Sequence, residues 1–184
     1  GLAMAITFFV TGASGFCGSH LCDYLREHGH QVIEGDRSRK WSEQPLDAVD
    51  VVVHLAAKVH VLQASAEDDG AFQRDNVDQT RELAEPAARA GVTRFVFVST
   101  IGVHGNASRE PLVETSEIAP AGGYAVSKWH AEEALRALKT PLEVVILRPP
   151  LIYGAGVKAN FASLMEAVRA GRWLPFGAVH NMRD

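Results

Sequence analysis

Short runs of β-branched and aromatic residues alternate along the chain with longer stretches whose apolar residues recur every three or four positions. The runs predict strands at residues 6–10, 31–34, 51–55, 95–98 and 143–147, and the stretches predict helices at 15–28, 72–90, 124–138 and 160–170. The run 51–55 is apolar on both faces, which predicts a central strand. Pro86 predicts a kink or an early end in the helix that contains it. Strands alternating with helices are typical of βαβ units, so we expect an α/β protein with a doubly wound parallel sheet.

The composition is that of a globular protein, with 47% hydrophobic and 22% charged residues among 184. A net charge of −4 without a long basic block argues against nucleic-acid binding, which needs a concentrated basic face. No stretch reaches 18 consecutive apolar residues, so we expect no membrane span. Cys17 and Cys22 are the only cysteines, and this low number fits a reducing, cytoplasmic compartment. The histidines show no metal-ligand spacing, and we expect His54 to be a hydrogen-bonded core residue.

A glycine-rich loop joins the first predicted strand to the first predicted helix. Its sequence, Thr-Gly-Ala-Ser-Gly-Phe-Cys-Gly at 11–18, permits a tight turn, close approach of the backbone to a pyrophosphate and close packing of helix on strand. The helix N-terminus offers free N–H groups and the positive end of its dipole to the phosphates. The pattern predicts a Rossmann-type dinucleotide site with the cofactor-binding residues Gly12, Ser14, Gly15, Phe16 and Gly18.

Asp36 ends the second predicted strand, where its carboxylate is placed to accept hydrogen bonds from the adenosine ribose. A 2′-phosphate would meet this carboxylate as a second anion at short range, so we expect NAD in preference to NADP. The neighbouring Arg37 is a further cofactor-binding candidate, and its guanidinium would favour that phosphate instead.

Tyr124 and Lys128 are four residues apart on one predicted helix, so their side chains share a face. An ammonium close to a phenol favours the phenolate and lowers the tyrosine pKa. A phenolate beside a nicotinamide is a suitable base for a hydroxyl whose carbon is losing a hydride. The pair therefore indicates redox catalysis at a carbon that carries a hydroxyl.

These motifs resemble those of the extended short-chain dehydrogenase/reductase family, particularly its NAD-dependent nucleotide-sugar epimerases, dehydratases and ketoreductases. The resemblance covers nearly the whole chain and also rests on the segments 54–57, 76–77, 98–100 and 147–154. The family usually fits another strand between the acidic residue and the central strand. Only 13 residues lie between Asp36 and Asp50, which predicts either a reduced sheet or residues missing from this sequence.

The resemblance assigns further site residues. It places Thr100, with Ser99 as the alternative, as the hydroxyl that bonds the reacting oxygen. Dehydratases of the family carry an Asp-Glu pair after that hydroxyl, whereas this sequence has Ile101 and Gly102, so dehydration is disfavoured. The adenosine and ribose side of the cofactor is expected to be lined by Leu55, Ala56, Ala57 and Lys58.

The resemblance also implies a nucleotide-diphosphate sugar as substrate. Arg183 resembles an arginine that binds the diphosphate, where a cation is chemically apt. Phe176 lies in a segment similar to the one near the nucleotide base, and Asn160 in one similar to bacterial members that handle N-acetylated sugars. Leu151 stands where many epimerases have Asn, so the sugar or diphosphate contacts must differ there.

The family likeness leads us to expect an NAD-dependent epimerase/oxidoreductase acting at the sugar C4. A 4-ketoreductase or dehydrogenase without epimerisation, a hydroxysteroid-type reductase and a catalytically silent dinucleotide-binding regulator remain alternatives. We expect an NAD-binding Rossmann domain at 1–154 and the beginning of a substrate-binding domain at 155–184, with the remainder absent. Family members often dimerise through helices corresponding to 72–90 and 124–138, and a homodimer could form through close helix contacts at Ala84, Ala87, Ala88, Ala131 and Ala134.

Overall fold

The computed structural model describes residues 5–55, 73–99, 123–148, 164–165 and 178–181. Its elements are β1 (Thr7–Thr11), α1 (Phe16–Glu27), β2 (Gln31–Glu34), the 3₁₀ turn η1 (Trp41–Glu43), β3 (Val51–His54), the π-helical segment η2 (Gln73–Asp78), α3 (Gln79–Arg89), β4 (Arg94–Val98), α4 (Gly123–Arg136), β5 (Glu143–Arg148) and β6 (Ala178–Asn181). The five predicted strands and the predicted helices 15–28 and 124–138 are confirmed, with bounds that differ by at most two residues. The predicted helix 72–90 is divided into the π-helical η2 and α3, so its α-helical part begins only at Gln79. Pro86 lies inside α3, which continues to Arg89, so the expected early end of this helix is wrong. Of the predicted helix 160–170, only residues 164–165 are described, and they are helical.

The strands form a single sheet in the order β2-β1-β3-β4-β5-β6. The first five strands run parallel, and β6, which the sequence did not predict, pairs antiparallel with β5. The chain moves to one side of β1 to form β2 and then to the other side to form β3. In open parallel sheets, ligands bind beyond the carboxyl ends of the strands at such a switch point. The ends of β1 and β3, where Thr11 pairs with His54, therefore mark the expected site.

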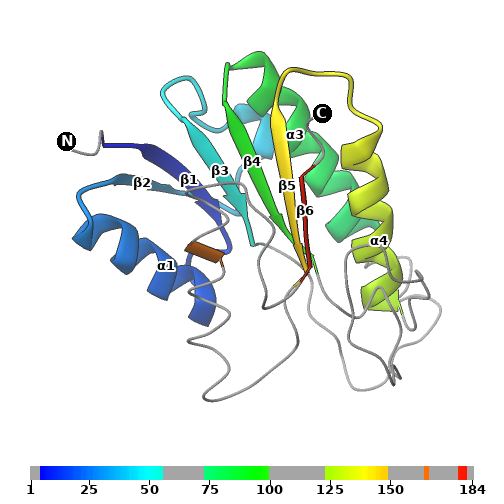
Figure 1. Ribbon diagram of the computed structural model, residues 1–184, viewed down its shortest axis with the longest axis horizontal. Coiled ribbons are helices and arrows are strands. Elements are labelled where there is room, and N and C mark those ends of the chain that lie inside the picture. Colours follow the sequence, from blue (N-terminus) through cyan, green and yellow to red (C-terminus); the bar gives the residue numbers. More distant parts are fainter. Residues whose placement is uncertain (1–4, 56–72, 100–122, 149–163, 166–177, 182–184) are drawn as a thin grey trace.

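Hydrophobic side chains on the two faces of the sheet form two separate cores. Alternate residues of a strand point to opposite faces, so Phe9 and Val52 join one core while Phe8 and Val53 join the other. The first core is covered by α3 and α4, which lie side by side, and the second by α1 (Figure 1). A sheet buried on both faces confirms the expected doubly wound, Rossmann-type fold.

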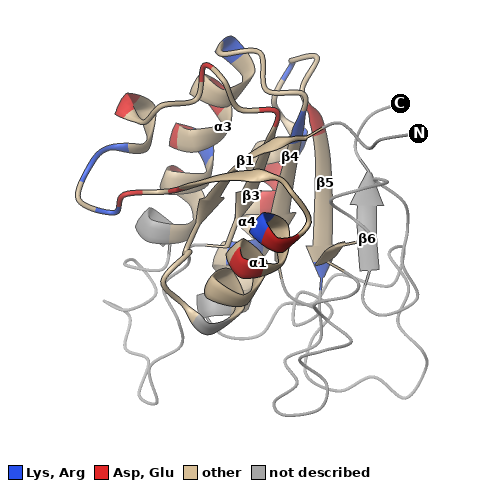
Figure 2. Ribbon diagram, turned by 90° about the vertical axis from the view of Figure 1, so that its left-hand side faces the viewer, with Lys and Arg blue, Asp and Glu red and all other residues tan. Residues whose placement is uncertain are grey.

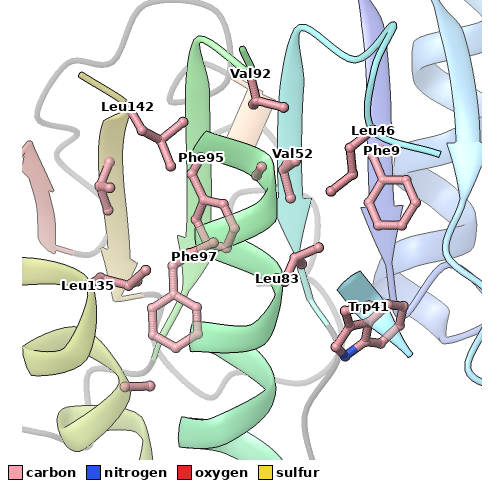
Figure 3. Close-up of a cluster of buried hydrophobic side chains, with 14 of the residues drawn as sticks. Phe9, Trp41, Leu46, Val52, Leu83, Val92, Phe95, Phe97, Leu135 and Leu142 are labelled. Atoms are coloured by element: carbon pink, nitrogen blue, oxygen red, sulfur yellow. The ribbon is translucent and has the colours of Figure 1, made fainter. Parts of the chain in front are cut away.

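A packed turn replaces the additional strand that the family usually has after β2. All residues between Asp36 and Asp50 are described, and they contain η1 but no strand, so the sheet is reduced there. Trp41 of η1 is only 6% exposed and stands edge-to-face on the ring of Phe9, with 6.4 Å between centroids (Figure 3). Its indole Nε1 donates to Gln79 at the start of α3. The short connection thus closes this end of the first core with one aromatic side chain.

Burial of three of the five helix alanines removes the argument for a dimer contact through those three. Ala84, Ala87 and Ala131 are completely buried within the single chain, because they face the sheet and the neighbouring helix. Acidic and basic residues lie along the exposed surface of α3 instead (Figure 2). The expected alanine-mediated contact is therefore wrong for these three positions.

None of the helices in the described ranges has the length and apolar content that a membrane crossing requires.

Candidate active site

The loop after β1 leaves the N-terminus of α1 open to a ligand. Gly12 has a φ of +70°, a conformation that favours glycine, and its carbonyl accepts a hydrogen bond of 3.1 Å from the N–H of Gly15. No side chain caps the helix at Gly15, and its first turn holds no acidic residue. The first N–H groups of the helix and the positive end of its dipole therefore suit an anion, and no carboxylate of the first turn competes for them.

Gly18 has a different role from the other two glycines of the loop. A Cβ atom at this position would lie 2.0 Å from the carbonyl oxygen of Gly12 and 2.8 Å from the Cα of Ala13. The missing side chain is what lets the first turn of α1 pack directly on the loop. Sequence spacing predicted this close approach, and the structure agrees with it.

Asp36 follows β2 and is held in place by its neighbours. Its Oδ1 accepts from the N–H (2.9 Å) and the hydroxyl (2.7 Å) of Ser38, and these bonds lower the pKa of the carboxyl. Gln44 accepts from the Asp36 N–H at 2.8 Å and donates to the Asp36 carbonyl at 2.7 Å. Within the described chain no group bonds Oδ2, so this exposed, ionised carboxylate keeps an oxygen for a ligand. Sequence reasoning found Asp36 but missed Gln44, which lies in the unusual connection after β2.

Lys128 is buried in α4 beside the end of β4. Its Nζ donates to the carbonyl of Val98 at 2.9 Å and lies 4.8 Å from the centre of the Phe97 ring. The side chain is only 2% exposed, and burial lowers the pKa of its ammonium to about 7. Tyr124 lies one turn earlier in the same helix, so the predicted pair belongs to one element. A buried amine that gives up its proton near neutral pH is typical of a functional site.

Ser99 continues β4 and is engaged elsewhere. Its N–H donates to the carbonyl of Leu147 at 2.7 Å, and its hydroxyl donates to Glu132 of α4 at 2.6 Å. Because the hydroxyl proton is committed to Glu132, Ser99 is poorly suited to bond a substrate oxygen. The contact favours Thr100 over Ser99 for that role. The sequence pattern did not single out Glu132, although it continues the four-residue spacing of Tyr124 and Lys128.

His54 connects the end of β1 to α4 through buried hydrogen bonds. Thr80 donates its hydroxyl proton to the carbonyl of Asn76, so it accepts from Nε2–H of His54 at 3.1 Å. The Nδ1 atom of His54 then accepts from the Thr11 hydroxyl at 2.6 Å, and Asn76 donates to Ser127 of α4 at 2.8 Å. Desolvation lowers the pKa of His54 to about 3, so the ring is neutral. The expected hydrogen-bonded core role is confirmed.

The structure brings several predicted site residues to the carboxyl edge of the sheet. Gly12, Ser14, Gly15, Gly18 and Leu55 lie at or next to the ends of β1 and β3, and Asp36 and Arg37 follow β2. The remaining candidates lie outside the described residues: Thr100, Ala56, Ala57, Lys58, Asn160, Phe176, Arg183 and the side chains of Phe16 and Tyr124. No cluster of three or more potential metal ligands occurs within the described ranges.

The family model of the NAD dependent epimerase/dehydratase family matches residues 8–184. The chain belongs to this family. A UDP-glucose 4-epimerase of Vibrio cholerae is 37% identical over an alignment of 199 residues, and this alignment covers 96% of the chain and 61% of the relative. A dTDP-4-dehydrorhamnose reductase of Mycobacterium tuberculosis is 31% identical over 173 residues, covering 88% and 55%. The chain thus spans about three-fifths of the length of these relatives.

The solved structures agree with this membership. The UDP-glucuronic acid 4-epimerase from Bacillus cereus, solved in complex with NAD, superposes with a TM-score of 0.71 at 26% identity. The superposition covers 81% of the chain and 57% of that protein. The family to which the chain belongs is NAD-dependent, which agrees with the cofactor expected from the sequence. The residues present fit it, because an uncapped helix N-terminus suits a pyrophosphate and a fixed carboxylate after β2 suits a ribose diol.

Proposed function

We propose that this protein is an NAD-dependent epimerase that acts at C4 of a nucleotide-diphosphate sugar. The observation that carries the proposal is the buried Lys128 amine, which lies one helical turn from Tyr124 at the edge of the sheet where the cofactor loop also lies. The UDP-sugar 4-epimerases among the relatives support the substrate class and the position of the reaction.

The residues named here divide the chemical work. Bound NAD supplies the hydride acceptor and, in the return step, the donor. Tyr124 takes the proton of the C4 hydroxyl, Lys128 lowers the pKa of that phenol while protonated, and Thr100 orients the same oxygen. Leu55, Ala56, Ala57 and Lys58 are proposed to line the adenosine side, while the N–H groups of α1 hold the pyrophosphate and Asp36 the ribose.

The substrate side rests on residues near the end of the chain. We propose that Arg183 binds the diphosphate and that Phe176 and Asn160 contact the nucleotide and the sugar. The division into an NAD-binding domain at 1–154 and a substrate-binding segment at 155–184 stays a prediction. Strand β6 pairs with β5, so residues 178–181 of the second segment belong to the sheet of the first domain. A homodimer also stays a prediction, which light scattering at micromolar concentration tests.

Substitution of Tyr124 tests the proposed chemistry. Tyr124→Phe should lower turnover of UDP-sugars by about 100-fold or more, because general-base assistance alone is worth about 100- to 10,000-fold. NAD affinity should change little, whereas Lys128→Met should weaken both turnover and NAD binding. Tyr24→Phe on α1, away from the site, is the matched control. Near-normal turnover by Tyr124→Phe would rule the mechanism out.

A net 4-ketoreductase is the second candidate, and the dTDP-4-dehydrorhamnose reductase relative favours it. The two functions use the same Tyr124, Lys128 and Thr100, so only the fate of the hydride separates them. An epimerase returns the hydride to the sugar and leaves the total NADH constant. A reductase consumes one NADH for each sugar reduced, which absorbance of the reduced nicotinamide measures on a panel of nucleotide sugars and their 4-keto forms.

A further inference from the structure

A cluster of buried charged side chains lies where α4 packs against the ends of β4 and β5. Glu132 is completely buried and forms an ion pair of 2.6 Å with Nη2 of Arg148, which is itself only 2% exposed. The Nε atom of Arg148 donates to both carboxylate oxygens, at 3.1 and 3.2 Å. Ser99 donates to Oε2 at 2.6 Å and Arg136 to Oε1 at 3.2 Å. So many donors fix the carboxylate in one orientation.

The position of Glu132 links this cluster to the proposed catalytic residues. Tyr124, Lys128 and Glu132 follow one another at four-residue intervals and therefore lie along one face of α4. Ser99, which bonds Glu132, immediately precedes Thr100. One carboxylate thus joins the helix that carries Tyr124 and Lys128 to the strand end that leads to Thr100.

Resting on the function proposed above, we propose that Glu132 is a positioning residue: it fixes α4 against the ends of β4 and β5 and places a negative charge one helical turn from Lys128. Neither Arg148 nor Ser99 can take over the second task, since one is a cation and the other is neutral. The role differs from that of Tyr124 and Lys128, because Glu132 acts through Lys128 and touches no reacting atom.

The surroundings of Lys128 show why this charge matters. Among the described residues, the groups that interact electrostatically with Lys128 are Glu132 on α4 and His54 on β3, whose ring stacks on Phe97. Arg136 and Arg148 are ion-paired with Glu132. The charged residues of α3 and Asp78 of η2 are exposed. Among the buried groups of the described chain, Glu132 is the one acid. Burial lowers the pKa of Lys128 and Glu132 acts to raise it, so loss of Glu132 should leave more of the amine neutral at pH 7.

Four variants separate this electrostatic role from a purely structural one. Glu132→Gln removes the negative charge and nearly keeps the shape, whereas Arg148→Met removes the opposite charge from the same ion pair. The double variant removes the Glu132 and Arg148 charges together and leaves only the partly exposed Arg136 without its ion-pair partner, which protects the fold if a single variant does not fold. Glu133→Gln, the exposed next residue on α4, is the matched control.

The first readout is the titration of Lys128 by NMR of ¹³C-labelled lysine in the protein without added ligand. Glu132→Gln should lower the Lys128 pKa by about one unit or more, and the double variant should also titrate below the parent. Arg148→Met should not lower it, because it removes a cation, and Glu133→Gln should leave it unchanged. Equal downward shifts in Glu132→Gln and Arg148→Met, or no shift in Glu132→Gln and the double variant, would overturn the proposal.

The second readout is the pH dependence of kcat/KM. A less protonated Lys128 stabilises the Tyr124 phenolate less, so the acid limb of the profile should move to higher pH in Glu132→Gln but not in Glu133→Gln. A uniform loss of activity with an unmoved limb would contradict the charge role. If the Lys128 titration shifts as expected while Tyr124→Phe keeps its turnover, the proposed function fails and the effect of Glu132 on Lys128 stands.

Discussion

Substitution of Gly18 by alanine measures how closely the phosphate loop packs on α1. The new Cβ would lie 2.0 Å from the Gly12 carbonyl oxygen, 2.7 Å from its carbon and 2.8 Å from the Ala13 Cα. Non-bonded carbon atoms pack about 3.5–4.0 Å apart, so the loop would have to move by roughly 1 Å. Overpacking typically costs about 1–3 kcal/mol, and here all three clashing atoms belong to the backbone. We therefore expect a loss of about 3 kcal/mol, or about 6–12 °C in Tm.

Gly15→Ala is the matched control, since it adds the same methyl group three residues away. Its Cβ would meet the Gly12 oxygen at 3.4 Å, an ordinary contact, and the Gly15 backbone (φ −74°, ψ 171°) suits alanine. Its cost should stay within about 1 kcal/mol, while NAD binding weakens because the methyl lies on the loop that faces the pyrophosphate. Urea unfolding followed by tryptophan fluorescence measures the stabilities. Equal stabilities of Gly18→Ala and Gly15→Ala would refute the packing argument.

Two further predictions concern Asp36 and His54. Asp36→Ala should narrow the preference for NAD over NADP, measured by titration of both cofactors; parent protein that binds NADP as tightly as NAD would contradict the reasoning. Between about pH 6.5 and pH 3 the unfolded chain protonates His54 while the folded chain keeps it neutral, so acid should cost up to about 1.4 kcal/mol of stability per pH unit. His54→Gln should flatten that slope in urea unfolding at several pH values, and an unchanged slope would assign the acid sensitivity to other groups.

Elements with a local signal could be predicted from the sequence. The apolar runs of β1, β3, β4 and β5 alternate with amphipathic helices, and their bounds follow from residues close to one another in the chain. The glycines of the loop and Asp36 were equally local, since their spacing within one βαβ unit carries the signal. Strand β6 was missed because Ala178–Asn181 carries no apolar run of its own, and its strand conformation depends on pairing with β5, 30 to 36 positions earlier.

The short length of the connection after β2 predicted a reduced sheet, but the sequence did not predict how this connection folds. Its 13 residues predicted a reduced sheet as one of two explanations, and the described turn agrees with it. The sequence did not show that Trp41 would bury its indole against Phe9 or that Gln44 would hold Asp36. Both contacts depend on how the turn folds back on the sheet edge, which no periodic pattern encodes.

Buried polar contacts explain why the site is harder to predict than the fold. Packing of apolar faces tolerates small shifts of a helix along a sheet, whereas hydrogen bonds with fixed partners do not. Helix α4 is held by Ser127 to Asn76 of η2, by Lys128 to Val98 of β4, and by Glu132 to β4 and β5. These partners lie between 16 and 51 positions away, so sequence spacing identifies Tyr124 and Lys128 as a pair but not the side chains that position them. The same bonds that escape sequence analysis fix where α4 presents its amine, so a reaction that depends on that placement should respond to substitution of Glu132 although this residue does not touch the sugar.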